Sequence, residues 1–261
     1  MPPIDILLRK LKYHSPIDPA DLAALRRLRC EIRELASGEE FIRQGDRPKA
    51  AAIVVEGVLA RYHTLQAGAR QYLALHYPGD WPDAQSLFLQ QMDHSVCAMG
   101  RAVVCSISHE QLMKTFAERP TIGFAVWRET LIDAAIFRKG ITNNSRRHGA
   151  ARIAHFFCEQ FHRAKLAGLA EGNACPLPLT QTQLGEMLGM SLVSINRHLK
   201  GCGRPRPPIT GPARSMSAHG RNSHRSASSI RVICIRSSGR STPGSLPVRR
   251  SAARGLFRSA P

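Results

Sequence analysis

The sequence has no uninterrupted apolar run of the eighteen or so residues that a membrane-spanning helix needs. Its first twelve residues alternate apolar and charged side chains, which excludes the apolar core of a signal peptide. The seven cysteines form no Cys-x-x-Cys pair, so neither a zinc site nor a disulfide framework is indicated. These absences predict a soluble cytoplasmic protein with reduced thiols, no metal or other cofactor, and no membrane partner.

Acidic residues are also scarce, and the last of them is Glu186. The chain of 261 residues carries 37 Lys and Arg against 19 Asp and Glu, a formal net charge of +18. Such a surplus suggests a polyanionic partner, because each Lys or Arg near a phosphate releases a counterion. Residues 201–261 supply +12 of it, however, so residues 1–200 are only moderately basic, and their length is sufficient for two domains.

Residues 32–109 are short β-type segments separated by glycine. Residues 53–55, 58–63 and 72–76 are rich in β-branched and aromatic side chains, which is typical of strands. Turns about every ten residues favour an antiparallel sandwich or jelly roll. Short amphipathic helices are expected before it, within residues 5–35.

The hydrophobic period lengthens to that of a helix over residues 121–141. One apolar stripe follows heptad positions and consists of Phe124, Trp127, Leu131, Ala134 and Ile141. A second stripe consists of Ala125, Ile132 and Ile136. We expect one face to lie on the β domain and the other to join a partner chain, with an ordinary core helix as the alternative. The Asn-Asn-Ser sequence at 143–145 is expected to end this helix, and another helix is expected from Arg146.

Residues 180–200 (TQTQLGEMLGMSLVSINRHLK) have the pattern of two short helices joined by a tight turn. Thr180 and Gln183 form a capping box at the start of the first helix. Gly189 supplies the left-handed turn that ends it, and Ser191 caps the second helix. This geometry lets a second helix enter a DNA major groove, which is about 12 Å wide.

The second helix has residue types that read DNA. We expect Leu192, Ile195 and Leu199 to face inward, which leaves an outer face of Val193, Ser194, Asn196, Arg197 and Lys200. Asn and Arg form paired hydrogen bonds with base edges, and Ser and Lys bind phosphates. A plain helical hairpin with a solvated face is the alternative.

Four stretches in order resemble the Crp/Fnr family of transcription regulators, over about residues 5–200. Residues 38–46 (GEEFIRQGD), 55–59 (VEGVL) and 77–81 (YPGDW) are similar to the glycine-cornered turns of its cyclic-nucleotide-binding-type β roll, and residues 180–199 are similar to its helix-turn-helix. The resemblance implies an α+β fold. Its parts are an antiparallel β roll in residues 1–115, a long dimerisation helix in 116–145 and a helix-turn-helix domain in 146–200.

The same resemblance implies a homodimer that binds a palindromic operator in double-stranded DNA. It implies regulation by a small-molecule effector, action on RNA polymerase, and no enzyme activity. By position, Arg197 matches the base-contacting arginine, and the phosphate-contacting positions are Thr180, Gln181, Ser191 and Ser194. Cyclic-AMP-responsive members have an Arg-Glu pair where this chain has Leu192 and Val193, so we expect a different target sequence.

The region that matches the effector pocket also departs from the nucleotide-binding members. Those members carry a Gly-Glu pair for the ribose and an arginine for the phosphate, and residues 80–89 (DWPDAQSLFL) have neither the glycine nor an arginine. Without a cation to offset a desolvated phosphate, we expect no cyclic nucleotide to bind tightly. The candidate pocket residues are Trp81, Asp83, Gln85 and Ser86.

Two other cofactor classes are not expected. Cluster-binding members of the family have an amino-terminal group of cysteines, whereas Cys30 stands alone in this chain. The residues His63, His76 and His94 suggest a cupin-like metalloenzyme as an alternative, but the His-x-His motif with a following Glu is absent.

Residues 201–261 differ in character from everything before them. Arg, Ser, Gly and Pro make up 38 of these 61 residues, a composition that predicts disorder and a helix-turn-helix without its wing. One interpretation is a basic arm that grips phosphates. The mix favours another, a reading-frame shift near codon 200 of a GC-rich gene. In that case the alternative to a DNA-binding regulator is a dimeric ligand-binding module that has lost specific DNA binding.

Overall fold

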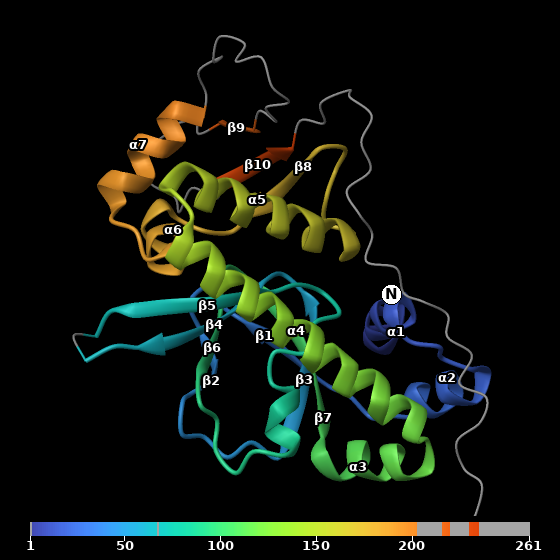
Figure 1. The fold of residues 1–261 in the computed structure, drawn as a ribbon. Coiled ribbons are helices and arrows are strands. Elements are labelled where there is room, and N and C mark those ends of the chain that lie inside the picture. Colours follow the sequence, from blue (N-terminus) through green and yellow to red (C-terminus); the bar gives the residue numbers. More distant parts are fainter. Residues whose placement is uncertain (1, 67, 203–215, 220–229, 235–261) are drawn as a thin grey trace, which may run out of the picture.

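The β-type segments between residues 31 and 108 form the two facing sheets of a β roll. The computed structural model describes residues 2–66, 68–202, 216–219 and 230–234, and Figure 1 shows the roll below a group of helices. One sheet has the strand order β1-β7-β3, and the other has the order β2-β6-β4-β5. The strands are β1 (Glu31–Leu35), β2 (Glu40–Ile42), β3 (Ala50–Glu56), β4 (Leu59–Thr64), β5 (Arg70–His76), β6 (Ser95–Ala98) and β7 (Ala102–Ser108).

Glycine is required at the corner between β3 and β4. Gly57 has φ of +78°, and a Cβ there would lie 2.5 Å from the carbonyl oxygen of Arg101. Side chains avoid both this backbone region and this close approach. Gly57 belongs to the stretch 55–59 that resembles a turn of the family's β roll, and no larger residue fits at this corner without strain.

Three short helices cover the roll. Helix α1 (Pro3–His14) buries Leu7 and Leu11, and α2 (Pro19–Arg26) begins with a capping box formed by Asp18 and Asp21. Helix α3 (His109–Glu118) continues from β7, and the short 3-10 helix η1 (Ala84–Leu87) lies in the connection between β5 and β6.

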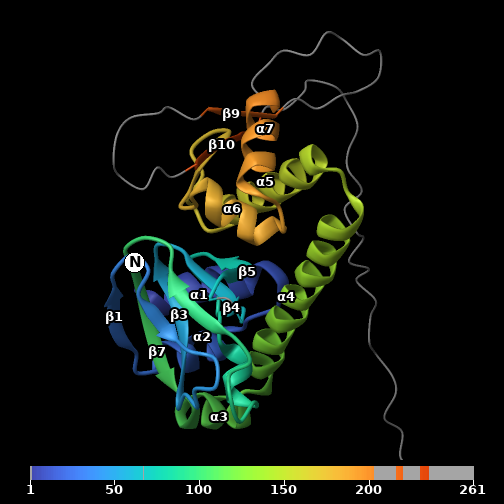
Figure 2. The ribbon, with the colours of Figure 1, turned by 90° about the vertical axis from the view of Figure 1, so that its left-hand side faces the viewer.

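The long helix α4 (Pro120–Arg146) runs beside the roll, as Figure 2 shows. It continues through the Asn-Asn-Ser sequence, so the predicted break at 143–145 is wrong. The amide of Asn143 donates to the carbonyl oxygen of Arg152, and Ser145 Oγ donates to the carbonyl oxygen of Ile141, so these polar residues are accommodated within the helix. The chain breaks instead at Arg147, before α5 (Gly149–Leu166).

The buried face of α4 does not coincide with the second stripe that was predicted, which consisted of Ala125, Ile132 and Ile136. Ile122, Ala125, Val126 and Glu129 are buried, whereas Ile132 is 37% exposed. Two acidic residues also lie on this inward face: Glu129 pairs with Lys10, and the half-buried Asp133 pairs with Arg61. Apolar periodicity alone does not predict a helix face that includes paired charges.

Helices α5, α6 (Gln181–Leu188) and α7 (Leu192–Cys202) lie over one end of the roll (Figure 2). Strand β8 (Ala174–Leu177) separates α5 from α6. Their apolar residues join those of β4 and β5 in one continuous core, where Tyr72 and Leu75 lie in the same cluster as Phe156 and Leu184. The helical unit is thus packed directly on the roll.

Two strands occur in the segment that was expected to lack structure. The strands β9 (Met216–His219) and β10 (Ile230–Cys234) pair antiparallel, and β10 also pairs with β8. The prediction of disorder is therefore wrong for these nine residues. The missing wing of the helix-turn-helix stays a prediction. Residues 230–234 (IRVIC) are mainly β-branched, and the edge of β8 offers free backbone groups. Residues 201 and 202 of the predicted tail belong to α7, and the rest of it lies outside the described residues.

Two cysteines that are far apart in the sequence lie side by side in the fold. The Cα atoms of Cys30 and Cys105 are 5.5 Å apart, a separation typical of disulfide-bonded cysteines. Strand β1 begins directly after Cys30 and pairs with β7, which contains Cys105. The two cysteines are 75 positions apart, so no local spacing could predict the pair.

Candidate functional site

The turn between α6 and α7 is built as the sequence predicts. The backbone N–H of Gln183 donates to Thr180 Oγ1 at 3.2 Å, and the N–H of Thr180 donates to Gln183 Oε1 at 2.8 Å, which confirms the capping box. Gly189 ends α6 in the left-handed region, with φ of +62°. Ser191 Oγ accepts from the N–H of Ser194 at 3.3 Å and so caps α7.

A second glycine brings the two helices close together. A Cβ on Gly185 would lie 2.6 Å from the carbonyl oxygen of Met190. Ile195 then packs completely buried against this turn, and Leu199 is partly buried beside it. The orientation of α7 relative to α6 is therefore set by close packing.

The outer face of α7 is available to a partner. Val193 is 77% exposed, and Arg197 and Lys200 are also exposed, while Ser194 and Asn196 are half-buried. Leu192 was expected to face inward but is 45% exposed. The inward stripe of this helix begins one turn later, at the fully buried Ile195. At the start of α6, Gln181 is exposed and Thr180 half-buried.

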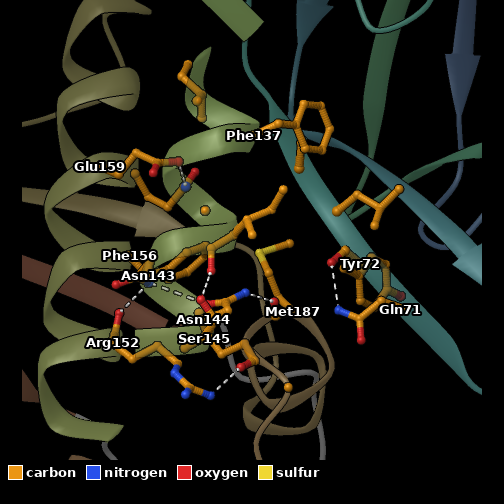
Figure 3. A pocket seen from close by; sticks show the side chains of 18 of the residues that line it. Gln71, Tyr72, Phe137, Asn143, Asn144, Ser145, Arg152, Phe156, Glu159 and Met187 are labelled. Carbon is orange, nitrogen blue, oxygen red and sulfur yellow. Dashed lines mark hydrogen bonds between the residues drawn. The ribbon is translucent and has the colours of Figure 1, made fainter. Parts of the chain in front are cut away.

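The carboxyl end of α6 is held by three side chains from other elements. The last carbonyl groups of a helix have no partner within it. The carbonyl oxygen of Glu186 accepts from Gln71 of β5, and that of Met187 accepts from Asn144 of α4 at 3.3 Å. Arg152 of α5 donates to the carbonyl oxygen of Leu188 at 3.1 Å. Figure 3 shows the Asn144 and Arg152 contacts beside a cavity at the junction of the roll and the helices.

The predicted heptad stripe of α4 is solvent-exposed in the single chain. Phe124 is 62% exposed, Trp127 60%, Leu131 52% and Ile141 68%, and Ala134 is half-buried. Phe124, Trp127 and Leu131 lie on the side of α4 that does not face the roll, whereas Ala134 and Ile141 line a cavity between the roll and α4. Large apolar side chains grouped on one helix face are unusual on the surface of a monomer.

A cavity of about 610 Å³ lies between the roll and α4. Trp81 and Gln85, two of the four predicted pocket residues, line it. Asp83 and Ser86 do not, because they are buried behind its wall: Asp83 accepts from the N–H of Ala52 at 2.8 Å, and Ser86 Oγ is 3.0 Å from His109 Nε2.

A network of paired charges, which the sequence analysis missed, borders this cavity. Arg61 is buried and donates to the carbonyl oxygen of Pro82 and to Asp133. Residues 80–89 contain no Lys or Arg, and the buried cation comes from β4 instead. The available signal was an arginine at an alternating position of the strand 59–64 (LARYHT).

Asp80 pairs with two more charges of the network, Lys10 and Arg163. Its carboxylate binds Lys10 of α1, Arg163 Nη2 of α5 at 2.8 Å and the N–H of Tyr77 at 2.9 Å. Burial would raise the pKa of Asp80, but Lys10 and Arg163 outweigh this effect and hold the pKa below its ordinary value. Lys10 also pairs with Glu129 of α4, so one cluster joins α1, α4, α5 and the roll.

The three histidines weighed as metal ligands all line the 610 Å³ cavity. His94 bonds to Asp93 at 2.7 Å and lies 3.2 Å from Gln85. Burial, and after it Arg61, holds the pKa of His76 far below the ordinary value, so its ring is neutral. Within the part of the chain that the structure describes, no three His, Cys, Asp or Glu residues are grouped so that they could hold a metal ion.

Asp83 gives a pH-dependent prediction. Its side chain is fully buried, and burial raises its pKa to about 7. An acid with a raised pKa destabilises the folded state when it ionises, and this cost grows from about pH 4 to pH 7. Asp83→Asn is therefore expected to match the wild type near pH 4 and to be more stable by roughly 2–4 kcal/mol at pH 8. Urea unfolding at both pH values measures this, with Asp5→Asn as the control because Asp5 is only half-buried. A pH-independent difference in stability would contradict the prediction.

Two families match the chain. Residues 32–119 match the cyclic nucleotide-binding domain, and residues 151–202 match the Crp-like helix-turn-helix domain. The first match covers the roll and α3, and the second covers α5 to α7. The second match ends where the Arg- and Ser-rich composition begins.

Among the described helices, none combines the length and hydropathy that a membrane crossing requires.

Curated relatives cover most of the chain. It is 24% identical over 203 residues to the transcriptional activator protein FnrL of Cereibacter sphaeroides, across 77% of this chain and 81% of the relative. It is 23% identical over 193 residues to the nitrogen fixation regulation protein FixK of Bradyrhizobium diazoefficiens, across 74% of this chain and 80% of the relative.

Solved structures share the fold. FixK2 from Bradyrhizobium japonicum is similar with a TM-score of 0.61 and 22% identity, over 67% of this chain and 84% of that one. The c-di-GMP-responsive global regulator CLP from Xanthomonas campestris is similar with a TM-score of 0.61 and 14% identity, over 84% of this chain and 100% of that one. The order of roll, long helix and helix-turn-helix is thus shared with both.

Proposed function

The chain belongs to the Crp/Fnr family of helix-turn-helix transcription regulators, and on that premise we propose that two copies join along α4 and bind a palindromic operator in response to a small-molecule effector. The observation that carries this proposal is the coexistence of two unpartnered faces, the apolar side of α4 and the outer side of α7. A two-fold axis along α4 would present two copies of α7 to successive major grooves. By family resemblance, the bound dimer would act on RNA polymerase.

The outer face of α7 supports base reading. Arg197 is exposed and carries the donors that pair with a guanine edge, and Asn196 beside it suits adenine. Val193 and Leu192 are exposed apolar side chains at the start of the helix, and thymine methyl groups are their natural contacts. Thr180, Gln181, Ser191, Ser194 and Lys200 are proposed to bind phosphates.

Arg197→Ala is expected to weaken binding to the selected operator by about 5- to 150-fold, because a bidentate base contact contributes about 1–3 kcal/mol. Its affinity for random DNA is expected to change little. The operator is first selected from a random pool with the purified full chain, and affinities are then measured by fluorescence anisotropy at several salt concentrations.

Lys200→Ala is the matched control, since loss of a phosphate contact weakens binding to operator and random DNA alike. It also lowers the slope of log affinity against log salt concentration by about one. Equal losses on both DNAs for Arg197→Ala would contradict base reading.

The 610 Å³ cavity is the proposed effector site, with Trp81 and Gln85 on its wall. Each cation on that wall already has a partner: Arg61 has Asp133, Lys10 has Asp80 and Glu129, and Arg163 has Asp80. A cyclic phosphate would have to break one of these pairs, so we expect cyclic AMP and cyclic GMP not to bind tightly. Calorimetric titration checks this, and micromolar affinity would contradict it.

The reading-frame hypothesis for the segment after residue 200 stays a prediction. Sequencing the gene across codon 200 tests it. The match to a Crp-like helix-turn-helix over residues 151–202 favours a DNA-binding regulator over a module that has lost this activity.

A further inference from the structure

Cys30 and Cys105 are neighbours in one sheet of the β roll. Cys105 lies in β7, the central strand of that sheet, which pairs with β1 on one side and with β3 on the other. Cys30 directly precedes β1, the outer strand beside β7 (Figure 2). The Cα atoms of the two cysteines are 5.5 Å apart, and this separation in disulfides is most often about 5.5–6 Å. A bond between the two sulfur atoms therefore requires no large movement of the backbone.

The two side chains differ in their access to solvent. Cys105 is 0% exposed, whereas Cys30 is half-buried. A small oxidant in solution can thus reach Cys30, and Cys105 is the adjacent buried thiol that completes a disulfide. Cys97 and Cys175, by contrast, are buried without a cysteine partner among the described residues. An accessible thiol beside a second, resolving thiol is the arrangement that reversible redox pairs use.

The pair adjoins the start of α4 within the core. Cys105 belongs to the same buried cluster as Ile122 of α4, and Cys30 packs against that cluster. The N–H of Arg29 donates to Gln111 Oε1 of α3 at 3.0 Å, so the segment before β1 is also tied to the helix that precedes α4. A bond at Cys30 would therefore act on a segment that contacts both α3 and α4.

Helix α2 extends this connection to the first turn of α4. Asp21 of α2 accepts from Arg119 Nε at 2.7 Å and from Thr121 Oγ1 at 2.6 Å, at the joint between α3 and α4. Only residues 27–30 separate α2 from β1. A covalent bond from Cys30 to Cys105 would anchor this short segment, and through α2 the start of α4, on the central strand of the sheet.

We propose that Cys30 and Cys105 are a reversible redox pair that clamps the start of α4 to the roll when it is oxidised and releases this constraint when it is reduced. The Cys30 thiolate would attack a small disulfide, such as oxidised glutathione, to form a mixed disulfide and expel one thiolate. The Cys105 thiol would then lose its proton to solvent and attack Cys30 Sγ, which expels the second thiolate. Two electrons pass from the pair to the small disulfide, and the reduced small thiol reverses both steps.

The reduced thiols that the sequence predicts are one of these two states. The redox state would bear on the proposed function, because α4 is the helix proposed to join two copies. The clamp itself lies within one chain, however, so it can be tested without DNA and in a monomer or a dimer alike.

Differential alkylation followed by mass spectrometry of the full chain tests whether the bond forms. After the folded protein is incubated with oxidised glutathione, we expect Cys30 and Cys105 to be joined to each other in most molecules. Reduced glutathione at about 10 mM should restore both thiols without denaturant. Cys158→Ser removes an exposed thiol of α5 and should keep the bond, whereas Cys30→Ser and Cys105→Ala should each abolish it.

Hydrogen exchange of the wild type in the oxidised and reduced states tests the clamp. Cross-links typically shift an opening equilibrium by about 30-fold or more. We therefore expect the backbone amides of residues 31–35 in β1 and 122–129 in α4 to exchange at least about tenfold more slowly in the oxidised state. Residues 181–188 of α6 belong to a different core cluster and should change by less than about threefold. In Cys30→Ser, the reductant should change none of the three segments.

The proposal is overturned if Cys30 and Cys105 do not become joined, or if reduced glutathione cannot open the bond in the folded chain. It is also overturned if β1 and the start of α4 exchange at the same rate in both states. Slowing of α6 equal to that of β1 would overturn it too, since a clamp acts locally. Operator binding plays no part in these measurements, so a failure here and a failure of the proposed DNA-binding function are distinguishable.

Discussion

Trp127→Asp is expected to convert the proposed dimer into a monomer and to weaken operator binding by at least about a hundredfold. Trp127 is 60% exposed at the centre of the apolar side of α4, between Phe124 and Leu131. Burying such aromatic side chains in an interface removes about 150–250 Å² each from water. A carboxylate in their place would be desolvated without a partner in both copies.

Loss of the dimer reduces DNA affinity because two joined helix-turn-helix units bind with an avidity that a single unit lacks, typically about 10²–10⁴-fold. Light scattering coupled to size-exclusion chromatography measures the mass, and fluorescence anisotropy measures the affinity. Met113→Asp is the matched control, since Met113 is 46% exposed on α3, away from this face. A Trp127→Asp dimer, or a monomer with full operator affinity, would contradict the proposed interface.

Asp80→Ala is expected to lower the free energy of unfolding by about 3–5 kcal/mol. The substitution leaves Lys10 and Arg163 without the carboxylate that they share, and removing one partner of a buried ion pair strands the other charge. It also removes the acceptor of the Tyr77 N–H. Because α1 and α5 both bind Asp80, the loss is expected to loosen the helix-turn-helix domain from the roll as well.

The Asp80 effect should depend on pH. The pKa of Asp80 is lower in the folded chain than in the unfolded chain, so its contribution is complete above the ordinary pKa of aspartate and disappears as the pH falls through the lowered value. Urea unfolding at pH 7 and at low pH measures both effects. Asp5→Ala is the control: Asp5 pairs with the exposed Arg26 at the surface, where a salt bridge contributes at most about 1 kcal/mol. Equal losses for the two variants would show that Asp80 has no special role.

The proposed effector cavity lies where a ligand could act on the long helix. It is bordered by Arg61 and Asp133, which connect the roll to α4. The end of α4 in turn holds the end of α6 through Asn144. A ligand in this cavity would therefore act on contacts that position α7 relative to α4, which is the physical requirement for coupling between an effector and DNA.

The features predicted correctly from the sequence depend on near neighbours in the chain. The capping box of Thr180 and Gln183, the left-handed Gly189 and the cap at Ser191 are each set within four residues. The alternation of β-branched residues and glycine corners identified the roll, and the heptad spacing of Phe124, Trp127 and Leu131 identified the exposed side of α4. Local backbone geometry and side-chain periodicity suffice for such features.

The remaining features join residues that are far apart in sequence. Arg61 meets Asp133, Asp80 meets Lys10 and Arg163, and Cys30 meets Cys105, all across more than fifty positions. These pairs, and the polar inward face of α4, replace water around buried charges, so they exist only once strands and helices have packed. Periodicity in the sequence predicts which apolar side chains are buried. Which polar side chains pair with each other depends on the elements that the folded chain brings together.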